Sequence, residues 1–445
     1  MTTKPERTDI LIKGATVLTM DRAGTVIENG SVTVRSDRLI RVGGSDPCEK
    51  DFPGQVIDAR GCIVMPGLVN VHTHLPMSLF RGLADDLPLM VWLNEHIFPA
   101  EGTHIRPETV YAATLLSCAE LLLSGTTCCC DGYFCESSVA DAVLKSGMRA
   151  VLGQGVIDYP APGVPDPGLN VDAAVSFVSQ WKEKHPRIVP SVFCHSPYTC
   201  SADTLKKAKR AARDHGVLFQ IHAAETRDEW EQMVQTTGLS PVAYLHSLGV
   251  LDRHTLLVHC VHTDEKDRRI IRASGAAVAH APESNMKLAA GVADIPDMMA
   301  LGIPVGIGTD GSASNNNLDL FSEMDCTAKL HKVIRKDPTV MNAETVLSMA
   351  TIGGARALGL DHLTGSLEYG KKADVIVVDT QKPHLTPMYC PLSHLVYAAT
   401  GSDVRDVMVD GRVLVRNREV LSFDVTRVMQ DVTLLARAIG KKPAP

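Results

Sequence analysis

The sequence predicts an α/β protein, a (β/α)8 barrel with a small β-sandwich domain built from both chain ends. Three observations predict this fold. Short apolar runs alternate with longer helical stretches over about 300 residues of the middle of the chain. Strand-like segments separated by turn residues occur at both ends. Most apolar runs are followed directly by a histidine or an acidic residue. We expect the first part of the sandwich at 1–64, the barrel at 65–364, and the second part with a C-terminal helix at 365–445.

The two ends of the chain share a strand-like pattern. Residues 9–42 contain three short alternating segments with turn residues between them, which predicts a small antiparallel sheet. Similar segments return at 372–379 and 404–415, so both ends can complete one sandwich. The stretch at 424–439 is amphipathic and predicts a terminal helix that packs on the rest of the protein.

The composition excludes several classes of protein. Of the 445 residues 45% are hydrophobic and 21% are charged, which fits a large core and neither a disordered nor a fibrous chain. The net charge of −7, without a Lys/Arg-rich block, argues against nucleic-acid binding. No apolar run is long enough to span a membrane, and the polar start of the sequence is not a secretory signal. We therefore expect a cytoplasmic protein that binds neither nucleic acid nor membrane.

The twelve cysteines do not predict a disulfide framework. Such frameworks are typical of short secreted chains, and no C-x-x-C pair occurs here. Cys128, Cys129 and Cys130 are consecutive, and neighbouring strand residues point to opposite faces, so the three cannot bind one ion. We expect them to be small buried side chains in a reducing compartment, with no assigned function.

Polar residues at the ends of the apolar runs indicate the active site. In an α/β barrel the carboxyl ends of all strands meet on one face, where catalysis takes place. A single histidine at a strand end is most simply a buried, hydrogen-bonded residue, but that explanation does not fit the whole set. The set is His72, His74, Asp131, His195, His222, Glu225, His259, His280 and Asp310.

Four of these residues predict a metal site. His72 and His74 lie two positions apart on one strand, so their side chains point the same way. His222 and Asp310 can add a nitrogen and an oxygen from other strands. Three imidazoles and one carboxylate suit Zn²⁺, and also Fe²⁺. A position left open for water would make this site catalytic.

The motifs resemble those of the amidohydrolase superfamily, in the branch of the 5′-methylthioadenosine/S-adenosylhomocysteine deaminases, which neighbours triazine and pterin deaminases. The resemblance covers about 9–420. It implies one zinc per subunit, held by His72, His74, His222 and Asp310 without a carboxylated lysine, and a chain that can form homo-oligomers. It also implies catalytic roles for Glu225 and His259. The segments that carry it are Val71–Met77, 81–93, 195–201, 222–226, 258–262, 284–288 and 308–316.

Within this resemblance, the residues imply a hydrolytic deaminase. Zinc brings the pKa of a bound water to about 7, Asp310 takes the proton of that water, and His259 stabilises its attack on a ring carbon. Glu225 is the candidate acid for the ring nitrogen, and Asp310 passes a proton to the leaving ammonia. His262 competes with His259, which we prefer because it follows the apolar run directly. The alternative for Glu225 is a carboxylate at a helix N-terminus.

The substrate residues also follow from the resemblance. Glu101 takes the position of a carboxylate that accepts ribose hydroxyls, His195 that of a residue facing the sugar, and Trp92 can wall the pocket. The alternatives are a core tryptophan and a solvated Glu101. Gln154 replaces an arginine that binds the carboxylate of S-adenosylhomocysteine, and 159–170 contains no Arg or Lys.

These residues favour 5′-methylthioadenosine, 5′-deoxyadenosine or adenosine as the small-molecule substrate over S-adenosylhomocysteine. The alternatives are an aminohydrolase of a pterin, guanine or an s-triazine, and a catalytically silent scaffold. Glu225 fits any reaction that protonates a ring, so it does not separate the first two. The intact histidines and Asp310 argue against the scaffold.

Overall fold

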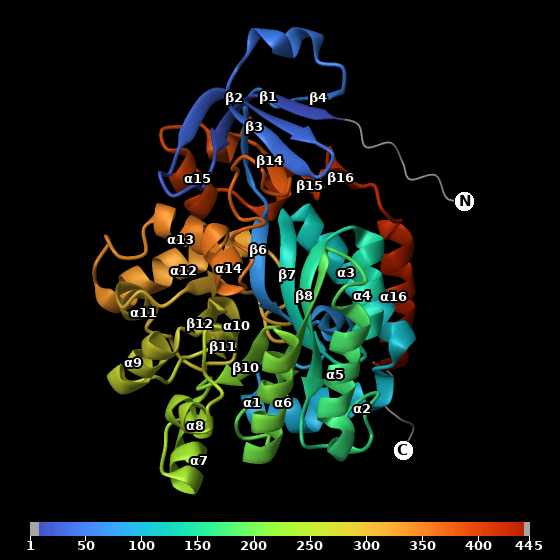
Figure 1. Cartoon of the computed structure of the whole chain (residues 1–445), viewed down its shortest axis with the longest axis vertical. Coiled ribbons are helices and arrows are strands. Elements are labelled where there is room, and N and C mark those ends of the chain that lie inside the picture. Colours follow the sequence, from blue (N-terminus) through green and yellow to red (C-terminus); the bar gives the residue numbers. More distant parts are fainter. Residues whose placement is uncertain (1–8, 440–445) are drawn as a thin grey trace.

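The computed structural model describes residues 9–439 and contains two sheets, one above the other in Figure 1. The lower sheet has eight parallel strands in sequence order, and the N–H of Asp310 after its last strand donates to the carbonyl of His72 on its first, at 3.0 Å. This contact nearly closes the sheet, which confirms the predicted barrel. The strands are β6 (Leu68–Thr73), β7 (Thr126–Tyr133), β8 (Arg149–Val156), β9 (Ile188–Cys194), β10 (Phe219–Ala223), β11 (Thr255–His259), β12 (Ala277–His280) and β13 (Val305–Ile307).

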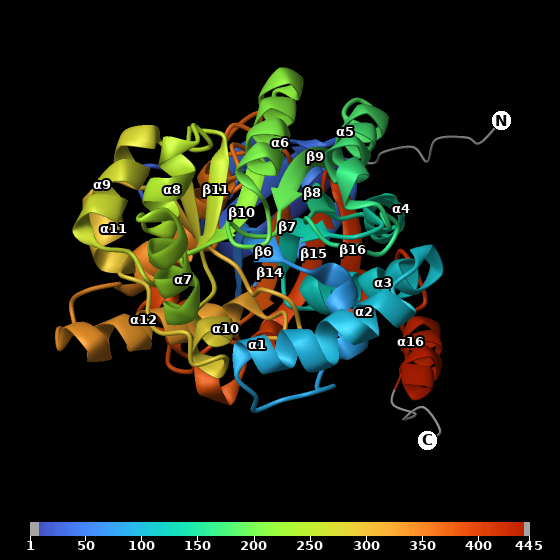
Figure 2. The same ribbon diagram turned by 90° about the horizontal axis from the view of Figure 1, so that it is seen from below.

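Helices surround this barrel, as the view from below shows (Figure 2). A typical one, α6, begins after Ser201, whose hydroxyl accepts from the N–H of Thr204, and ends at Gly216, where φ is 63°. Its buried face repeats every three to four residues. The helices are α3 (Pro107–Leu123), α4 (Glu136–Ser146), α5 (Asn170–Trp181), α6 (Ala202–His215), α7 (Arg227–Thr237), α8 (Pro241–Ser247), α9 (Glu265–Ser274), α10 (Pro282–Lys287), α11 (Ile295–Ala300), α12 (Leu320–Arg335), α13 (Ala343–Met349) and α14 (Ile352–Ala357).

Strands from both ends of the chain form the second sheet, in the order β17-β16-β15-β14-β5-β1-β2-β3, with β4 beside β1. Alternate side chains from both halves pack into a core separate from that of the barrel, among them Ile12, Val32 and Val377. Strands from the two chain ends are therefore joined in one mixed sheet, as the sequence predicts. Its strands are β1 (Ile10–Leu18), β2 (Val26–Arg35), β3 (Arg38–Gly44), β4 (Gln55–Asp58), β5 (Cys62–Pro66), β14 (Val375–Asp379), β15 (Val404–Val409), β16 (Arg412–Arg416) and β17 (Glu419–Val420).

The apolar run that begins at Cys62 contributes one strand to each sheet. It pairs as β5 in the upper sheet, passes Gly67 and continues as β6 in the barrel. A Cβ on Gly67 would lie 2.1 Å from the side chain of Thr127, so only glycine fits at this crossing. A buried ion pair also joins the sheets, because Nε of Arg149 on β8 lies 2.8 Å from Oδ2 of Asp374 beside β14.

Two further segments complete the fold. A strap between β6 and α3, formed by α1 (Leu89–Val91), a π-helical turn (Trp92–Ile97) and α2 (Phe98–His104), contributes to the wall of the pocket described below. Helix α15 (Pro391–Tyr397) precedes β15, and α16 (Val425–Ile439) packs on α3 (Figure 1). In the part of the chain that the structure describes, no helix is long and apolar enough to cross a membrane.

Candidate active site

Four ring and carboxylate atoms meet at the carboxyl end of the barrel. Nε2 of His72 lies 3.2 Å from Nε2 of His222 and 3.4 Å from Oδ1 of Asp310. Nε2 of His74 lies 3.3 Å from the same oxygen. The four side chains come from β6 and the residue after it, from β10, and from the loop after β13, and all are at least nine-tenths buried.

These separations fit a zinc ion. Ligands about 2.0–2.1 Å from a tetrahedral Zn²⁺ lie about 3.3 Å from one another, which matches the three separations just given. The protonation states also fit. Burial brings the pKa of His72 to about 4 and holds those of His74 and His222 below their usual value, so these imidazoles are neutral and can donate lone pairs.

Hydrogen bonds outside the cluster orient the ligands. The carbonyl of Gly132 lies 2.6 Å from Nδ1 of His74 and accepts its proton, which leaves Nε2 free for a metal. Oδ2 of Asp310 accepts from the hydroxyls of Ser284 at 2.7 Å and Ser314 at 2.9 Å. Burial alone would raise the pKa of Asp310, but the adjacent imidazoles bring it well below its usual value. Asp310 is therefore ionised, with Oδ1 turned to the cluster.

Glu225 and His259 lie beside the cluster. Oε2 of Glu225 is 3.8 Å from Nε2 of His259, and Nδ1 of His259 lies 2.9 Å from the amide oxygen of Asn285. The amide oxygen accepts the Nδ1 proton, so Nε2 faces the site with its lone pair. Burial raises the pKa of Glu225, whose side chain is only 12% exposed, which favours the protonated form of this carboxyl more than in an exposed glutamate.

Three residues at or beside the site have a strained backbone conformation. Ala224, His259 and Asp310 have φ of 54°, 72° and 61°, in the left-handed region that side chains other than glycine seldom adopt. Each follows or ends a barrel strand. Such conformations persist only where the surrounding structure holds them, and they concentrate at functional sites.

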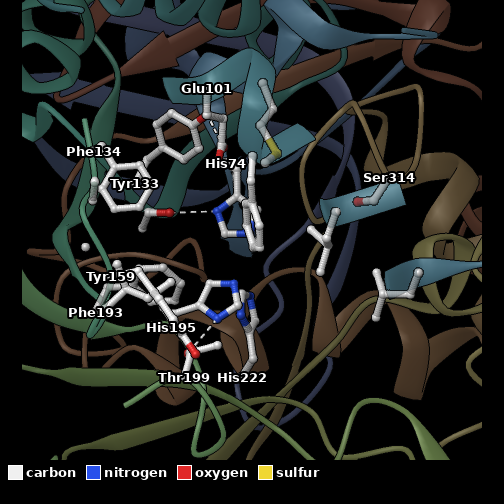
Figure 3. Close-up of a pocket in the computed structure, with 18 of the residues that line it drawn as sticks. His74, Glu101, Tyr133, Phe134, Tyr159, Phe193, His195, Thr199, His222 and Ser314 are labelled. Carbon is white, nitrogen blue, oxygen red and sulfur yellow. Dashed lines mark hydrogen bonds between the residues drawn. The ribbon is translucent and has the colours of Figure 1, made fainter. Parts of the chain in front are cut away.

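The cluster forms the floor of a cavity of about 480 Å³. Glu225, His259, His74, His222 and Asp310 line this cavity, and the strap from α1 to α2 forms part of the wall. Figure 3 shows Glu101 and Tyr133 on the opposite side of this cavity from His195 and His222. The rest of the lining is mainly apolar and aromatic, including Leu89, Trp92, Leu93, Phe98, Phe134, Tyr159, Pro162 and Leu288.

Comparisons with known proteins agree with this geometry. The model of the Amidohydrolase family matches residues 63–414. The chain belongs to the amidohydrolase family. A 5-methylthioadenosine/S-adenosylhomocysteine deaminase of Syntrophobacter fumaroxidans is 48% identical over 436 residues, which are 97% of this chain and 99% of that protein. The predicted resemblance is thereby confirmed.

Two further proteins are similar to this amidohydrolase. A 5′-deoxyadenosine deaminase of Methanosarcina mazei is 43% identical over 433 residues, 97% of this chain and 98% of that protein. An adenosine deaminase from Xanthomonas campestris, solved with bound zinc, superposes with a TM-score of 0.95 at 35% identity, covering 98% of this chain and 99% of that one. The bound zinc of that structure agrees with the ligand cluster found here.

The structure brings most of the candidate substrate residues of this amidohydrolase to the cavity. Glu101 is buried rather than solvated, and Oε1 accepts a 2.5 Å hydrogen bond from the hydroxyl of Tyr133. His195 lies at the end of β9, with Nδ1 2.9 Å from the hydroxyl of Thr199 (Figure 3). Trp92 is buried in the strap and also lines the cavity, so it is both a core and a wall residue.

Gln154 is the exception, because it lies apart from the cavity. Its amide oxygen accepts from the N–H of Glu136, at the start of α4, at 3.1 Å. On β8, Gly155 lines the cavity, and the position before it therefore faces the helix layer. His262 is also outside the cluster, since its Nε2 lies 2.7 Å from the carbonyl of Ala290. The geometry thus favours His259 over His262 as the histidine that faces the reacting atoms.

Sequence reasoning missed several residues that hold this amidohydrolase site. Tyr133, Asn285 and Ser314 contact Glu101, His259 and Asp310, respectively. Asn285 belongs to a recognised motif, and Ser314 follows Asp310 by four positions, so both were visible as motif members without a role. Tyr133 contacts Glu101 across 32 positions, and no local pattern indicates that pair.

Proposed function

We propose that this amidohydrolase is a zinc-dependent hydrolytic deaminase of adenine nucleosides with a small, uncharged 5′ group. It converts the 6-amino group of 5′-methylthioadenosine, 5′-deoxyadenosine or adenosine to the 6-oxo product and ammonia. One observation carries the proposal. The metal-binding cluster, the carboxyl of Glu225 and the buried Glu101 all open into the same mainly apolar cavity.

Similar proteins support the reaction class. The relatives described above are named as deaminases of 5-methylthioadenosine, S-adenosylhomocysteine or 5′-deoxyadenosine, and a similar zinc-bound structure is an adenosine deaminase. Identities of 48% and 43% over nearly the whole chain place this protein among them.

The chemistry of the chain's own residues fits hydrolytic removal of an amino group. A zinc held by His72, His74, His222 and Asp310 would supply a water that ionises near pH 7. His259 holds the attacking oxygen through Nε2, and Asp310 accepts its proton. Glu225 donates a proton to the ring nitrogen as the adjacent carbon becomes tetrahedral, and Asp310 then returns a proton to the leaving ammonia.

Two residues support a ribose. An ionised carboxylate accepts hydrogen bonds from neighbouring hydroxyls, and Glu101 offers one in a buried position where competing water is scarce. Its Oε1 is already held by Tyr133, which fixes the carboxylate in one orientation. His195 lies between the metal-binding cluster and Thr199, in a position to face the sugar.

The part of the cavity that would hold the 5′ group of the substrate, called the 5′ subsite here, determines which nucleoside is preferred. Among the described residues that line the cavity, no side chain is a lysine or an arginine. The loop from Tyr159 to Pro162 contributes only an aromatic ring, two prolines and an alanine. An amino-acid carboxylate such as that of S-adenosylhomocysteine would be held there without a cation, whereas a methyl or methylthio group is well matched.

The test is ammonia release by the zinc-loaded protein from a panel of amines. The panel contains adenosine, 5′-methylthioadenosine, 5′-deoxyadenosine, S-adenosylhomocysteine, guanine, isoxanthopterin and melamine. We expect turnover of the first three and at least tenfold lower kcat/KM for S-adenosylhomocysteine, about 1.4 kcal/mol. Turnover of a bare ring alone would retain the zinc chemistry but replace the nucleoside by a pterin, guanine or a triazine. Bound zinc without any turnover would favour the silent scaffold.

We also propose that the enzyme works in the cytoplasm and that it forms homo-oligomers. The described cysteines are free thiols, and all but Cys135, Cys326 and Cys390 are buried, which suits a reducing compartment. Sedimentation of the purified protein would measure the number of subunits in the assembly.

A further inference from the structure

A second buried carboxylate lies behind Glu225 and has no part in the reaction described above. Glu229, in the first turn of α7, is 4% exposed. Its Oε1 accepts from the N–H of Ala224 at 2.9 Å, and its Oε2 accepts from the N–H of Glu225 at 2.7 Å. Both oxygens thus bind peptide N–H groups of the loop between β10 and α7. This loop carries Glu225 and is called the catalytic loop below.

This contact differs from an ordinary helix start. The hydroxyl of Thr226, which begins α7, accepts from the N–H of Glu229 at 3.2 Å, as a capping residue does. A glutamate at this third position of a helix usually returns to the N–H of the capping residue itself. Here it passes Thr226 and binds the two N–H groups before it. The carboxylate is therefore used on the catalytic loop and not on the helix end.

The loop needs such a support. Ala224 has a φ of 54°, a left-handed conformation that an alanine does not hold by itself. Its carbonyl accepts from the N–H of His262 at 2.8 Å, so the loop that follows neighbouring β11 holds the other side of the same residue. The two contacts fix the peptide on both sides, and the direction of the next side chain, Glu225, is fixed with it.

We propose that Glu229 is a positioning residue that aims the carboxyl of Glu225 at the ring of the substrate. This inference rests on the proposed function, because it requires that Glu225 protonates the ring of the substrate. It does not depend on which amine is the substrate. Any ring that Glu225 protonates would require the same aim. A displacement of about 1 Å at a reacting group can cost 10²-fold in rate.

The experiment is a double-mutant cycle in the zinc-loaded enzyme. Glu229→Gln retains the shape but turns an NH₂ group toward one of the two N–H donors, so one peptide loses its partner. We expect kcat to fall about 10²-fold with KM and zinc content near wild type. In a Glu225→Gln background the same substitution should have no further effect, because there is no carboxyl left to aim. The matched control is Glu231→Gln on the same helix, where the side chain is 59% exposed and pairs with Arg227.

Equal losses in both backgrounds would overturn the proposal, since they would show a general effect on the site. An unchanged kcat in the single variant would overturn it as well. Glu229→Asp replaces Glu229→Gln in the cycle if the latter does not fold, because it retains the charge and shortens the reach. Amide hydrogen exchange of Ala224 and Glu225 supplies a readout independent of turnover. Faster exchange of either amide in the variant supports the contact even if no amine on the panel is a substrate, and unchanged exchange contradicts it.

Discussion

Oε2 of Glu225 lies 3.8 Å from Nε2 of His259, at the edge of the metal-binding cluster. Two groups that face each other across this distance can act on adjacent atoms of one ring: Glu225 on the nitrogen that gains a proton, and His259 on the oxygen that attacks the neighbouring carbon. This relationship makes the roles of the two residues separable by mutation.

Glu225→Gln should lower kcat by about 10²–10⁴-fold, because the ring nitrogen loses its proton donor. Zinc content and thermal stability should remain near wild type, since Glu225 is not a ligand of the cluster. Steady-state kinetics with 5′-methylthioadenosine and metal analysis of the same preparation measure both quantities. A variant with near-normal kcat would remove Glu225 from the mechanism.

Removal of the metal should abolish turnover and lower the thermal midpoint. Zinc bound to the folded protein at 100 times its Kd adds about 2.7 kcal/mol to stability, and a chelator withdraws that contribution. His222→Ala should lose zinc, whereas His262→Ala, in the neighbouring loop but outside the cluster, should retain one zinc per chain. Metal content of the two variants decides the ligand assignment, and equal zinc content would contradict it.

The carboxyl of Glu101 should give binding of the ribose a pH dependence. Burial raises the pKa of Glu101 to about 7, an effect that the hydrogen bond from Tyr133 only partly offsets. The ionised form accepts hydroxyl protons, so preference for a sugar with hydroxyls should rise as pH increases through 7 and fall below it. The measured quantity is the ratio of kcat/KM for adenosine to that for 2′,3′-dideoxyadenosine.

In the Glu101→Gln variant this ratio should be lower by about 10–10²-fold at alkaline pH and independent of pH. The dideoxy substrate serves as the internal control, because other groups of the site act on both nucleosides alike. A ratio that retains the wild-type pH profile would place the ribose elsewhere in the cavity.

The sequence was sufficient for the barrel and its metal ligands, for a physical reason. Strand ends in a barrel converge, so a histidine or aspartate after an apolar run is a candidate for the site. His280 and Asp131 are exceptions, because Nε2 of His280 lies 3.3 Å from Nε2 of His331 on α12, Oδ1 of Asp131 accepts from the N–H of Leu75, and neither residue lines the cavity. For His72, His222 and Asp310, the position after an apolar run was enough to predict them as members of the cluster, without any knowledge of side-chain orientation. The joining of strands from both chain ends was likewise visible in their matching alternation.

Orientation within a buried strand was not predictable in the same way. Strand β8 is buried along its whole length, so its sequence shows no polar side that would separate the cavity face from the helix face. Gln154 was expected at the substrate for this reason and lies instead at α4. The contact of Glu229 with the N–H groups of Ala224 and Glu225 was not predictable either. The spacing from Thr226 to Glu229 is that of an ordinary capping box, in which the glutamate would bind Thr226 itself.

The buried ion pair between Arg149 and Asp374 should be important for stability. Arg149→Met would leave the buried Asp374 without its cation, whereas the buried Asp410 would retain Lys372, whose Nζ lies 3.2 Å from Oδ1. Loss of one partner of a buried pair costs about 3–5 kcal/mol, whereas an exposed pair contributes less than about 1 kcal/mol. Arg269→Met, which breaks an exposed pair with Glu265, is therefore the control. Thermal unfolding of the zinc-loaded proteins should show a large decrease only for Arg149→Met; equal midpoints would contradict the assignment.

The last prediction concerns the absence of a cation at the 5′ subsite. Ala161→Arg places a guanidinium in the loop that lines the cavity, where it can bind the carboxylate of S-adenosylhomocysteine. A hydrogen-bonded charge pair is worth about 1.5–3 kcal/mol, so kcat/KM for this substrate relative to 5′-methylthioadenosine should rise about 10–10²-fold. Ala161→Gln controls for side-chain size.

Gln154→Arg tests the same idea from the position that the sequence alone indicated. In the structure this side chain is directed to α4, next to the buried Glu136, so a guanidinium there has a carboxylate partner within the protein. We expect no change in the ratio of the two substrates. A rise with Gln154→Arg and none with Ala161→Arg would show that the amino-acid end of the substrate reaches past Gly155 toward α4, and the 5′ subsite would then extend beyond the loop from Tyr159 to Pro162.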